Sequence, residues 1–280
     1  MIGETENLRP VHEGRSFISE RLFKTGISRE QSLLKAANIV ERNFLVSLQY
    51  DWETGQPVKL TEIGLKNWFT NLDNLGNSGA SCLCGLLDHP SDPTIILQWR
   101  QSPSRRPKKE RIECTIPHNI TLDSLLTLFS QFNPDFQALH SYVYHFVLLQ
   151  LHGRAMRKYE QALAKRRPEE HQYICIPQPF EGVSDTLPPL LLAYEFDCLR
   201  VPEGIWWVNY WSPLQVETVG IERIRAAEWE RLIELPNGGV TVAVTADPLD
   251  VTNSDHMNKL GKIVKQLNLR ELQEQHLVTH

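Results

Sequence analysis

The sequence lacks several features that would assign its class at once. Its 280 residues contain only five cysteines, an odd number, and no apolar stretch long enough to span a bilayer. The most apolar stretches, Tyr142–Leu151 and Leu187–Ala193, are short. The beginning of the chain has no apolar core of a secretory signal. We therefore expect a cytoplasmic protein with reduced thiols, no disulfide framework and no membrane contact.

Common catalytic motifs are also missing. The chain contains no GxxxxGK[ST], GxGxxG, GxSxG or HExxH pattern. Cys82-x-Cys84, with His89 and Cys114 nearby, has the wrong spacing for a zinc knuckle, and no second pair follows. On a strand these two cysteines share one face, and packing in the core is the better interpretation. The residues alone identify no catalytic group, resident metal or cofactor.

The composition and the local patterns predict an α+β protein. Apolar residues make up 41% and charged residues 22%, which is ordinary for a globular chain. Apolar residues at helical spacing follow the capping box Ser28-x-x-Gln31, which predicts a helix there. The same spacing follows Thr121, and Asn133-Pro134 is predicted to end this second helix. We expect a mixed or mostly antiparallel sheet with helices packed on its faces.

Further elements are predicted by the same reasoning. Residues 1–16 are polar and are predicted to form a loosely tied leader. The basic segment Ser102–Lys109 is predicted to be an exposed loop. Thr61 is a candidate N-cap of one further helix, and Thr252 or Asn253 of another. Residues 214–224 form a further helix-like unit. Asn237-Gly238-Gly239 is predicted to form the turn of a hairpin that leads into residues 240–245. Strands are predicted at residues 45–52, 81–87, 94–100, 111–116, 190–200, 204–211 and 240–245. The segment 138–149 suits a buried strand, although its pattern also fits a helix.

Two regions are distinguished by charge and by a proline-rich connection. Residues 1–180 carry 21 basic and 19 acidic side chains, whereas residues 181–280 carry 8 and 15, a net of −7. The C-terminal excess disfavours direct nucleic-acid binding and favours a basic protein partner, although a plainly solvated surface has the same composition. The two regions either form separate domains or share one sheet.

Two C-terminal segments are candidates for function. Asp247, Asp250, Asp255 and His256 bring three carboxylates and an imidazole together in sequence, which suits a metal-dependent hydrolase as well as a polar loop with a helix start. In the segment Gly204–Trp211, strand alternation places Trp206, Val208 and Tyr210 on one face and Trp207, Asn209 and Trp211 on the other. Either both faces are core, or one faces a partner.

The C-terminal motifs resemble a known family. They are Ile205-Trp206-Trp207-Val208-Asn209-Tyr210-Trp211, Val219-Gly220-Ile221-Glu222-Arg223, Asn237-Gly238-Gly239, Thr245-Ala246-Asp247-Pro248-Leu249-Asp250 and Leu269-Arg270. Together they resemble the immunity protein 52 family of bacterial polymorphic-toxin systems, over residues 190–275. The resemblance implies a non-enzymatic protein that binds and inhibits a cognate nuclease toxin of the type VI secretion class, in the cytoplasm of the producing cell.

The family's neutralising contacts do not carry over to particular residues, so the partner-binding residues are our own prediction. They combine carboxylates suited to a basic nuclease cleft with polar and aromatic anchors. The predicted set is Glu195, Asp197, Glu203, Trp207, Asn209, Trp211, Asp247 and Asp250. A metal-dependent hydrolase, a non-inhibitory adaptor or scaffold, and a homodimer are the alternatives that remain open.

Overall fold

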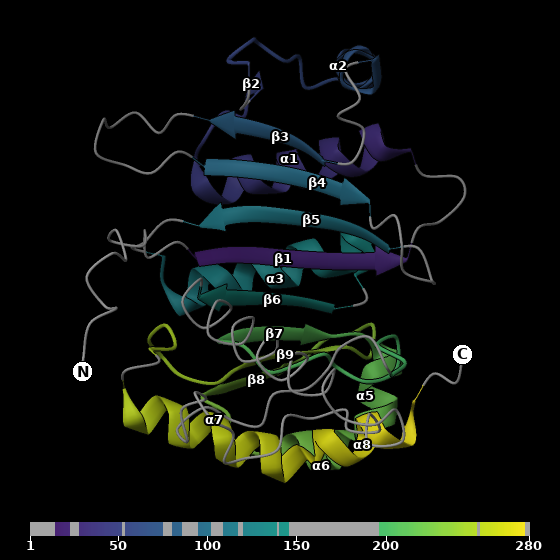
Figure 1. The fold of residues 1–280 in the computed structure, drawn as a ribbon. Coiled ribbons are helices and arrows are strands. Elements are labelled where there is room, and N and C mark those ends of the chain that lie inside the picture. The colour runs from purple at the N-terminus through teal and green to yellow at the C-terminus, as the bar shows by residue number, and fades with distance from the viewer. Residues whose placement is uncertain are drawn as a thin grey trace, which may run out of the picture.

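The computed structural model describes most of both regions of the chain. The described residues are 15–22, 28–51, 54–74, 80–85, 95–101, 109–116, 120–138, 140–145, 196–250 and 253–277. Their strands form one antiparallel sheet in the order β2-β3-β4-β5-β1-β6-β7-β9-β8 (Figure 1). The predicted α+β class, with a mostly antiparallel sheet, is therefore confirmed. In these ranges no helix combines the length and apolar character needed to cross a membrane.

The strands are β1 (Arg15–Leu22), β2 (Tyr50–Asp51), β3 (Ala80–Gly85), β4 (Ile95–Gln101), β5 (Lys109–Ile116), β6 (His140–His145), β7 (Val208–Trp211), β8 (Arg231–Glu234) and β9 (Val240–Ala243). The helices are α1 (Arg29–Phe44), α2 (Glu62–Asn74), α3 (Leu122–Phe136), α5 (Pro213–Val219), α6 (Ile221–Ala226), α7 (Ser254–Leu267) and α8 (Leu269–Gln275). Because β6 pairs with β7, the two regions predicted from the charge balance share one sheet.

Helices α1 and α3 cover one face of the sheet (Figure 1). The ring of Phe17 on β1 packs edge-on against Phe129 and Phe132 of α3, with ring centroids 5.1 and 4.9 Å apart. Asn133 lies in the same layer and receives a hydrogen bond from Ser141 of β6 (2.5 Å). Helices α5 to α8 gather at the other end of the sheet, near β7, β8 and β9.

Several sequence predictions fail at particular elements. The predicted leader ends too late, because the central strand β1 already begins at Arg15. Lys109 is not in an exposed loop, since it begins β5 and is buried. Helix α3 continues through Asn133-Pro134 to Phe136, because Phe136 in its last turn packs against Phe132 in the core.

The other deviations concern strand lengths and one helix break. Residues 45–49 are irregular, so the predicted strand 45–52 is reduced to β2. Of the predicted strand 190–200, residues 190–195 lie outside the described residues. Phe196 makes an isolated bridge with Leu277, and residues 197–200 form a turn. The helix-like unit 214–224 is divided into α5 and α6 at Gly220, whose φ of 91° interrupts the helix.

Candidate functional site

A charged cluster lies on the face of the sheet opposite α3. Along β1, Phe17 and Ser19 point toward α3, so the alternation of a strand directs Glu20 to the other face. His140 is directly opposite Glu20 on β6, and Lys109 extends from β5, the strand on the other side of β1. The segment 196–206 covers this face and contributes Glu203.

Lys109 connects the two carboxylates of this cluster. Its Nζ lies 3.2 Å from Glu20 Oε2 and 3.2 Å from Glu203 Oε1, and only 6% of its side chain is exposed. Burial favours loss of the proton, but the carboxylates of Glu203 and Glu20 outweigh it and raise the pKa of Lys109 above its usual range. Lys109 is therefore charged at neutral pH.

Glu20 is ionised because positively charged groups surround it. Burial alone would raise its pKa, yet the neighbouring His140, Lys109 and Arg111 together lower the pKa of Glu20 overall. Arg111 Nη1 lies 3.9 Å from Glu20 Oε1, and its Nη2 lies 3.2 Å from Glu113. The cluster therefore holds a buried ion-pair network that joins β1, β5 and the segment 196–206.

His140 is the unusual member of the cluster. Its residue is 4% exposed, and burial lowers its pKa, so the ring is neutral at pH 7. Nε2 lies 3.4 Å from Glu20 Oε2, but neither ring nitrogen makes a hydrogen bond to any described residue. Buried polar atoms in native proteins nearly always have partners, including water or an ion, so this ring requires an explanation.

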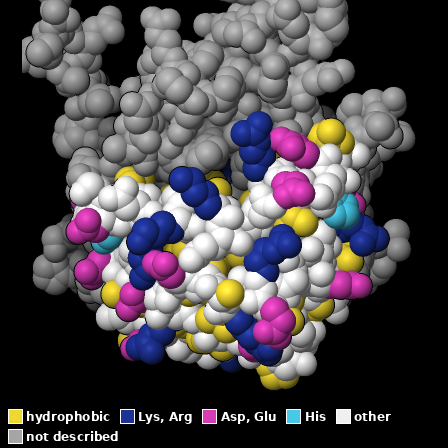
Figure 2. Space-filling view, turned by 90° about the horizontal axis from the view of Figure 1, so that it is seen from below, with side chains coloured by type: hydrophobic (Ala, Val, Ile, Leu, Met, Phe, Trp, Pro, Cys, Tyr) yellow, Lys and Arg dark blue, Asp and Glu magenta, His cyan; other side chains and the backbone are white. Residues whose placement is uncertain are grey.

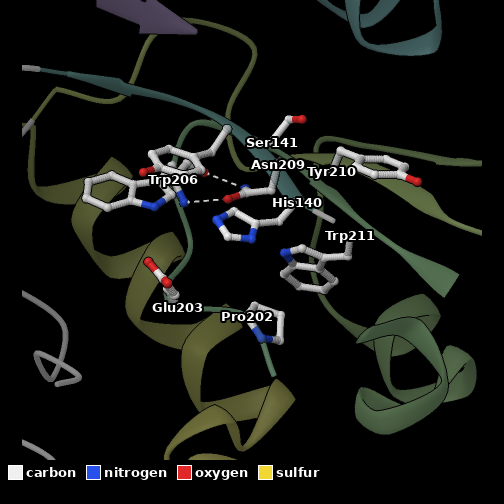
Figure 3. A pocket seen from close by; sticks show the side chains of 10 residues that line it. His140, Ser141, Pro202, Glu203, Trp206, Asn209, Tyr210 and Trp211 are labelled. Carbon is white, nitrogen blue, oxygen red and sulfur yellow. Dashed lines mark hydrogen bonds between the residues drawn. The ribbon is translucent and has the colours of Figure 1, made fainter. Parts of the chain in front are cut away.

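A small cavity adjoins the His140 ring (Figure 3). Its walls include Glu203, Asn209 and Trp211, and it has room for about one water molecule. A substrate of ordinary size does not fit in this space. The arrangement suits a fixed charge network, a bound water or a single ion, and it does not resemble an open active-site cleft.

The segment 196–206 lies between α8 and the sheet and contacts both. The Asp197 amide donates to the carbonyl of His276 (2.8 Å), and Gln273 Nε2 donates to the carbonyl of Pro202 (2.9 Å). The Trp206 ring stacks on Tyr142 of β6, with centroids 5.4 Å apart. Glu203 is therefore positioned by contacts on both sides of its segment.

Metal-ligating residues meet at one place among the described residues. Glu20, His140 and Glu203 each offer a ligand atom, and these atoms lie within 4.8 Å of one another. The predicted hydrolase set, which includes Asp247 and Asp250, forms no such group in the described ranges. The structure therefore assembles a different set of potential ligands from the one that the sequence suggested.

In place of a metal group, the predicted hydrolase segment begins a helix. The Asn253 side chain caps α7 by accepting from the amides of Asp255 (2.9 Å) and His256 (3.3 Å). His256 Nδ1 accepts a hydrogen bond from the Asp250 amide at 3.2 Å. These contacts agree with the polar-loop and helix-start interpretation.

Three of the predicted partner-binding residues are buried. Trp207, Asn209 and Trp211 are 3%, 1% and 2% exposed, so the expectation that their face meets a partner is corrected. The reason is that the sheet is covered on both faces here: the Trp211 ring packs edge-on against Trp229, 5.8 Å away. Asn209 closes a local turn through hydrogen bonds with the backbone amide and carbonyl of Trp206, both 2.8 Å.

The predicted carboxylates have different surroundings. Glu195 lies outside the described residues. Asp197 is half-buried and accepts from the Leu199 amide at 3.0 Å, while Glu203 belongs to the charged cluster. Asp247 and Asp250 are exposed between β9 and α7.

On the face near α6, α7 and α8, the described acidic side chains do not form one continuous patch (Figure 2). At the end of the molecule near α6, α7 and α8, basic and acidic side chains are intermixed (Figure 2). Arg225 pairs with Glu222 and Glu234, and other pairs neutralise further carboxylates. These other pairs are Lys259–Glu230, Lys262–Glu228 and Arg270–Glu274.

The prediction that the cysteines pack in the core is confirmed for Cys84 and Cys114, which are buried, whereas Cys82 is only half-buried. Cys82 accepts a hydrogen bond from Gln98 Nε2 at 2.9 Å. Burial raises the pKa of Cys114 far above the usual thiol range, so this thiol is inert at neutral pH.

Comparison with known proteins adds one match. Residues 167–267 match the model of a family described as a domain of unknown function, DUF5953. No curated protein matches the chain. The matched range includes the segment that carries Glu203 and the strands β7, β8 and β9, but not Glu20, Lys109 or His140. The similarity therefore covers the C-terminal contribution to the charged cluster.

Proposed function

We propose that this protein is an immunity protein that binds a nuclease toxin and inhibits it. The proposal rests on the resemblance of the C-terminal motifs to the immunity protein 52 family. The positions of these motifs are compatible with a binding protein, because most of the tryptophan motif is buried in the core and the aspartates of the Thr245–Asp250 motif are exposed.

The docking surface that we propose is an acidic rim, defined as Asp247, Asp250 and Asp255. All three are exposed on the loop and first helical turn between β9 and α7. The hydrogen bond from the Asp250 amide to His256 connects the loop to this turn. A nuclease has a basic substrate cleft, and exposed carboxylates on a rigid support can occupy it and accelerate association.

The direct test uses the product of the adjacent gene. We expect the two proteins to co-purify and the purified complex to have lost nuclease activity. The triple variant Asp247→Lys, Asp250→Lys and Asp255→Lys should bind at least tenfold more slowly at low salt, and this difference should shrink as salt rises. Glu217→Lys is the matched control, because Glu217 is also exposed but lies on α5.

The outcomes separate the alternatives. A stable complex with full nuclease activity would leave only an adaptor or scaffold. Inhibition that is insensitive to the triple variant would place the docking surface elsewhere while preserving the immunity function. A neighbouring gene without a toxin domain, together with no protection of cells that express candidate nucleases, would contradict the proposal itself.

A further inference from the structure

We propose that Glu20, His140 and Glu203 form a binding site for a divalent transition-metal cation such as Zn²⁺, in which the ammonium of Lys109 takes the place of the cation when no metal is bound. This site is separate from the acidic rim and does not depend on the proposed immunity function. It also goes beyond the sequence-based prediction, which assigned no metal to the chain.

The donor set has the chemistry that Zn²⁺ uses in proteins. Imidazole nitrogen and carboxylate oxygen bind zinc at about 2.0–2.2 Å, which places two ligands of a tetrahedral site about 3.4 Å apart. His140 Nε2 and Glu20 Oε2 are separated by 3.4 Å, and the Glu203 ligand atom lies within 4.8 Å of both. Once Lys109 is displaced, Glu203 would move closer to this pair and complete three protein ligands.

His140 supplies an independent observation. The ring is buried and faces the carboxylate of Glu20, yet neither nitrogen has a hydrogen-bond partner among the described residues. A ligating histidine uses one nitrogen for the metal and donates with the other, and a water in the adjoining cavity would accept this hydrogen bond. Metal binding would therefore satisfy a ring that forms no hydrogen bond with any of the described residues.

Lys109 indicates that the site needs a cation. Glu20 and Glu203 are drawn together from β1 and from the segment 196–206, and their mutual repulsion is relieved by the ammonium 3.2 Å from each. A metal must displace this ammonium, so Lys109 acts as an internal competitor. Replacing Lys109 with an uncharged residue should therefore strengthen metal binding, whereas a purely structural ion-pair cluster would only lose stability.

The imidazole also sets the selectivity. Mg²⁺ and Ca²⁺ prefer sites made entirely of oxygen ligands, whereas imidazole suits Zn²⁺ and its first-row neighbours. Zn²⁺ should therefore bind more tightly than Mg²⁺. This preference distinguishes the site from a general attraction of cations to exposed carboxylates.

The experiment titrates the full chain, without a histidine tag, with Zn²⁺ by calorimetry and against a chromophoric chelator. We expect one Zn²⁺ per chain in the wild type, and affinity at least tenfold higher in Lys109→Met. Glu203→Gln and His140→Gln should each weaken binding at least tenfold in the Lys109→Met background. Glu217→Gln is the control, since Glu217 is an exposed carboxylate on α5 and lies outside the ligand set.

Circular dichroism keeps the test independent of misfolding. Glu203 is partly exposed on a covering segment, so Glu203→Gln is expected to fold. This variant still tests the site if His140→Gln, on β6, does not fold. Failure of both the wild type and Lys109→Met to bind Zn²⁺ would overturn the proposal. Binding that is unchanged by Glu203→Gln in folded protein would also overturn it, because the metal would then occupy another histidine.

Discussion

At the scale of single residues, Lys109 is buried because two carboxylates meet it. We predict that Lys109→Met, measured with a chelator present, lowers the free energy of unfolding by about 3 kcal/mol, since breaking a buried ion pair leaves uncompensated charges. Urea denaturation measures this change. The double variant Lys109→Met/Glu203→Gln should recover part of the loss because it removes one of those charges.

An exposed lysine provides the comparison for this prediction. Lys66→Met on α2 should change the unfolding free energy by no more than about 0.5 kcal/mol. A loss below about 1 kcal/mol for Lys109→Met would show that Arg111 alone compensates Glu20, and that the segment carrying Glu203 relaxes toward solvent.

The charged cluster was not predictable from local sequence patterns. Lys109 is 89 residues from Glu20 and 94 residues from Glu203 in the chain. Lys109 also follows a basic, proline-containing stretch, which is typical of a solvated loop. Pattern reasoning grouped residues that are near in sequence, such as Asp250 and His256, whereas an antiparallel sheet brings distant strands together.

At the scale of elements, the sequence predicts helix starts better than the interior of the sheet. Ser28 and Gln31 form the predicted capping box of α1, and Asn253 caps α7. The Thr61 hydroxyl accepts from the Gly64 amide (3.1 Å), as expected for its cap. Each cap depends on residues within one turn, so a local sequence pattern is sufficient.

The central strand β1 was missed because its pattern is not that of a half-solvated strand. Phe17 and Ser19 share the helix-facing side, and Ile18 and Glu20 share the other side. Each face therefore carries both an apolar and a polar residue, because buried hydrogen bonds and ion pairs satisfy Ser19 and Glu20. Hydrophobic alternation does not detect a strand of this kind.

Two glycines of the C-terminal helices allow a matched prediction. Gly220 has a φ of 91° between α5 and α6, whereas Gly261 lies within α7, and a Cβ at either position meets no atom within 4 Å. Gly220→Ala should lower the unfolding free energy by about 1 kcal/mol, because an L-residue is strained at positive φ. Gly261→Ala should raise it by up to about 1 kcal/mol through helix propensity.

Thermal and urea denaturation of the two glycine variants check this contrast. Their environments are equally open, so the difference between them reports backbone conformation and not crowding. If both variants are destabilised equally, the break between α5 and α6 does not require the positive φ of Gly220.

At the scale of the whole molecule, the charge boundary near residue 180 does not divide the sheet. β6 and β7 are hydrogen-bonded neighbours, and α3 contacts β7 and β9 as well as β6. The Tyr142–Trp206 stack and the Lys109–Glu203 ion pair also cross the boundary. A difference in net charge therefore describes surface composition and says little about which strands pair.

This continuity predicts that the C-terminal region does not fold independently. The fragment 181–280 leaves the β6-facing edge of β7 unpaired and removes the α3 contacts from β7 and β9. We expect it to show poor chemical-shift dispersion by NMR and no cooperative thermal transition, since buried backbone and apolar groups would be exposed together. The intact chain should unfold in one transition in which near-ultraviolet and far-ultraviolet circular dichroism coincide.

Complementation provides the decisive control for the fragment experiment. Co-expression of 1–180 with 181–280 should restore a soluble complex, and Glu203→Gln should weaken it because Lys109 then loses one of its carboxylates. A fragment 181–280 that unfolds cooperatively by itself would contradict the prediction. The β6–β7 pairing would then be an interface between two domains that each carry their own core, and the proposed role of the acidic rim could be tested on the C-terminal domain alone.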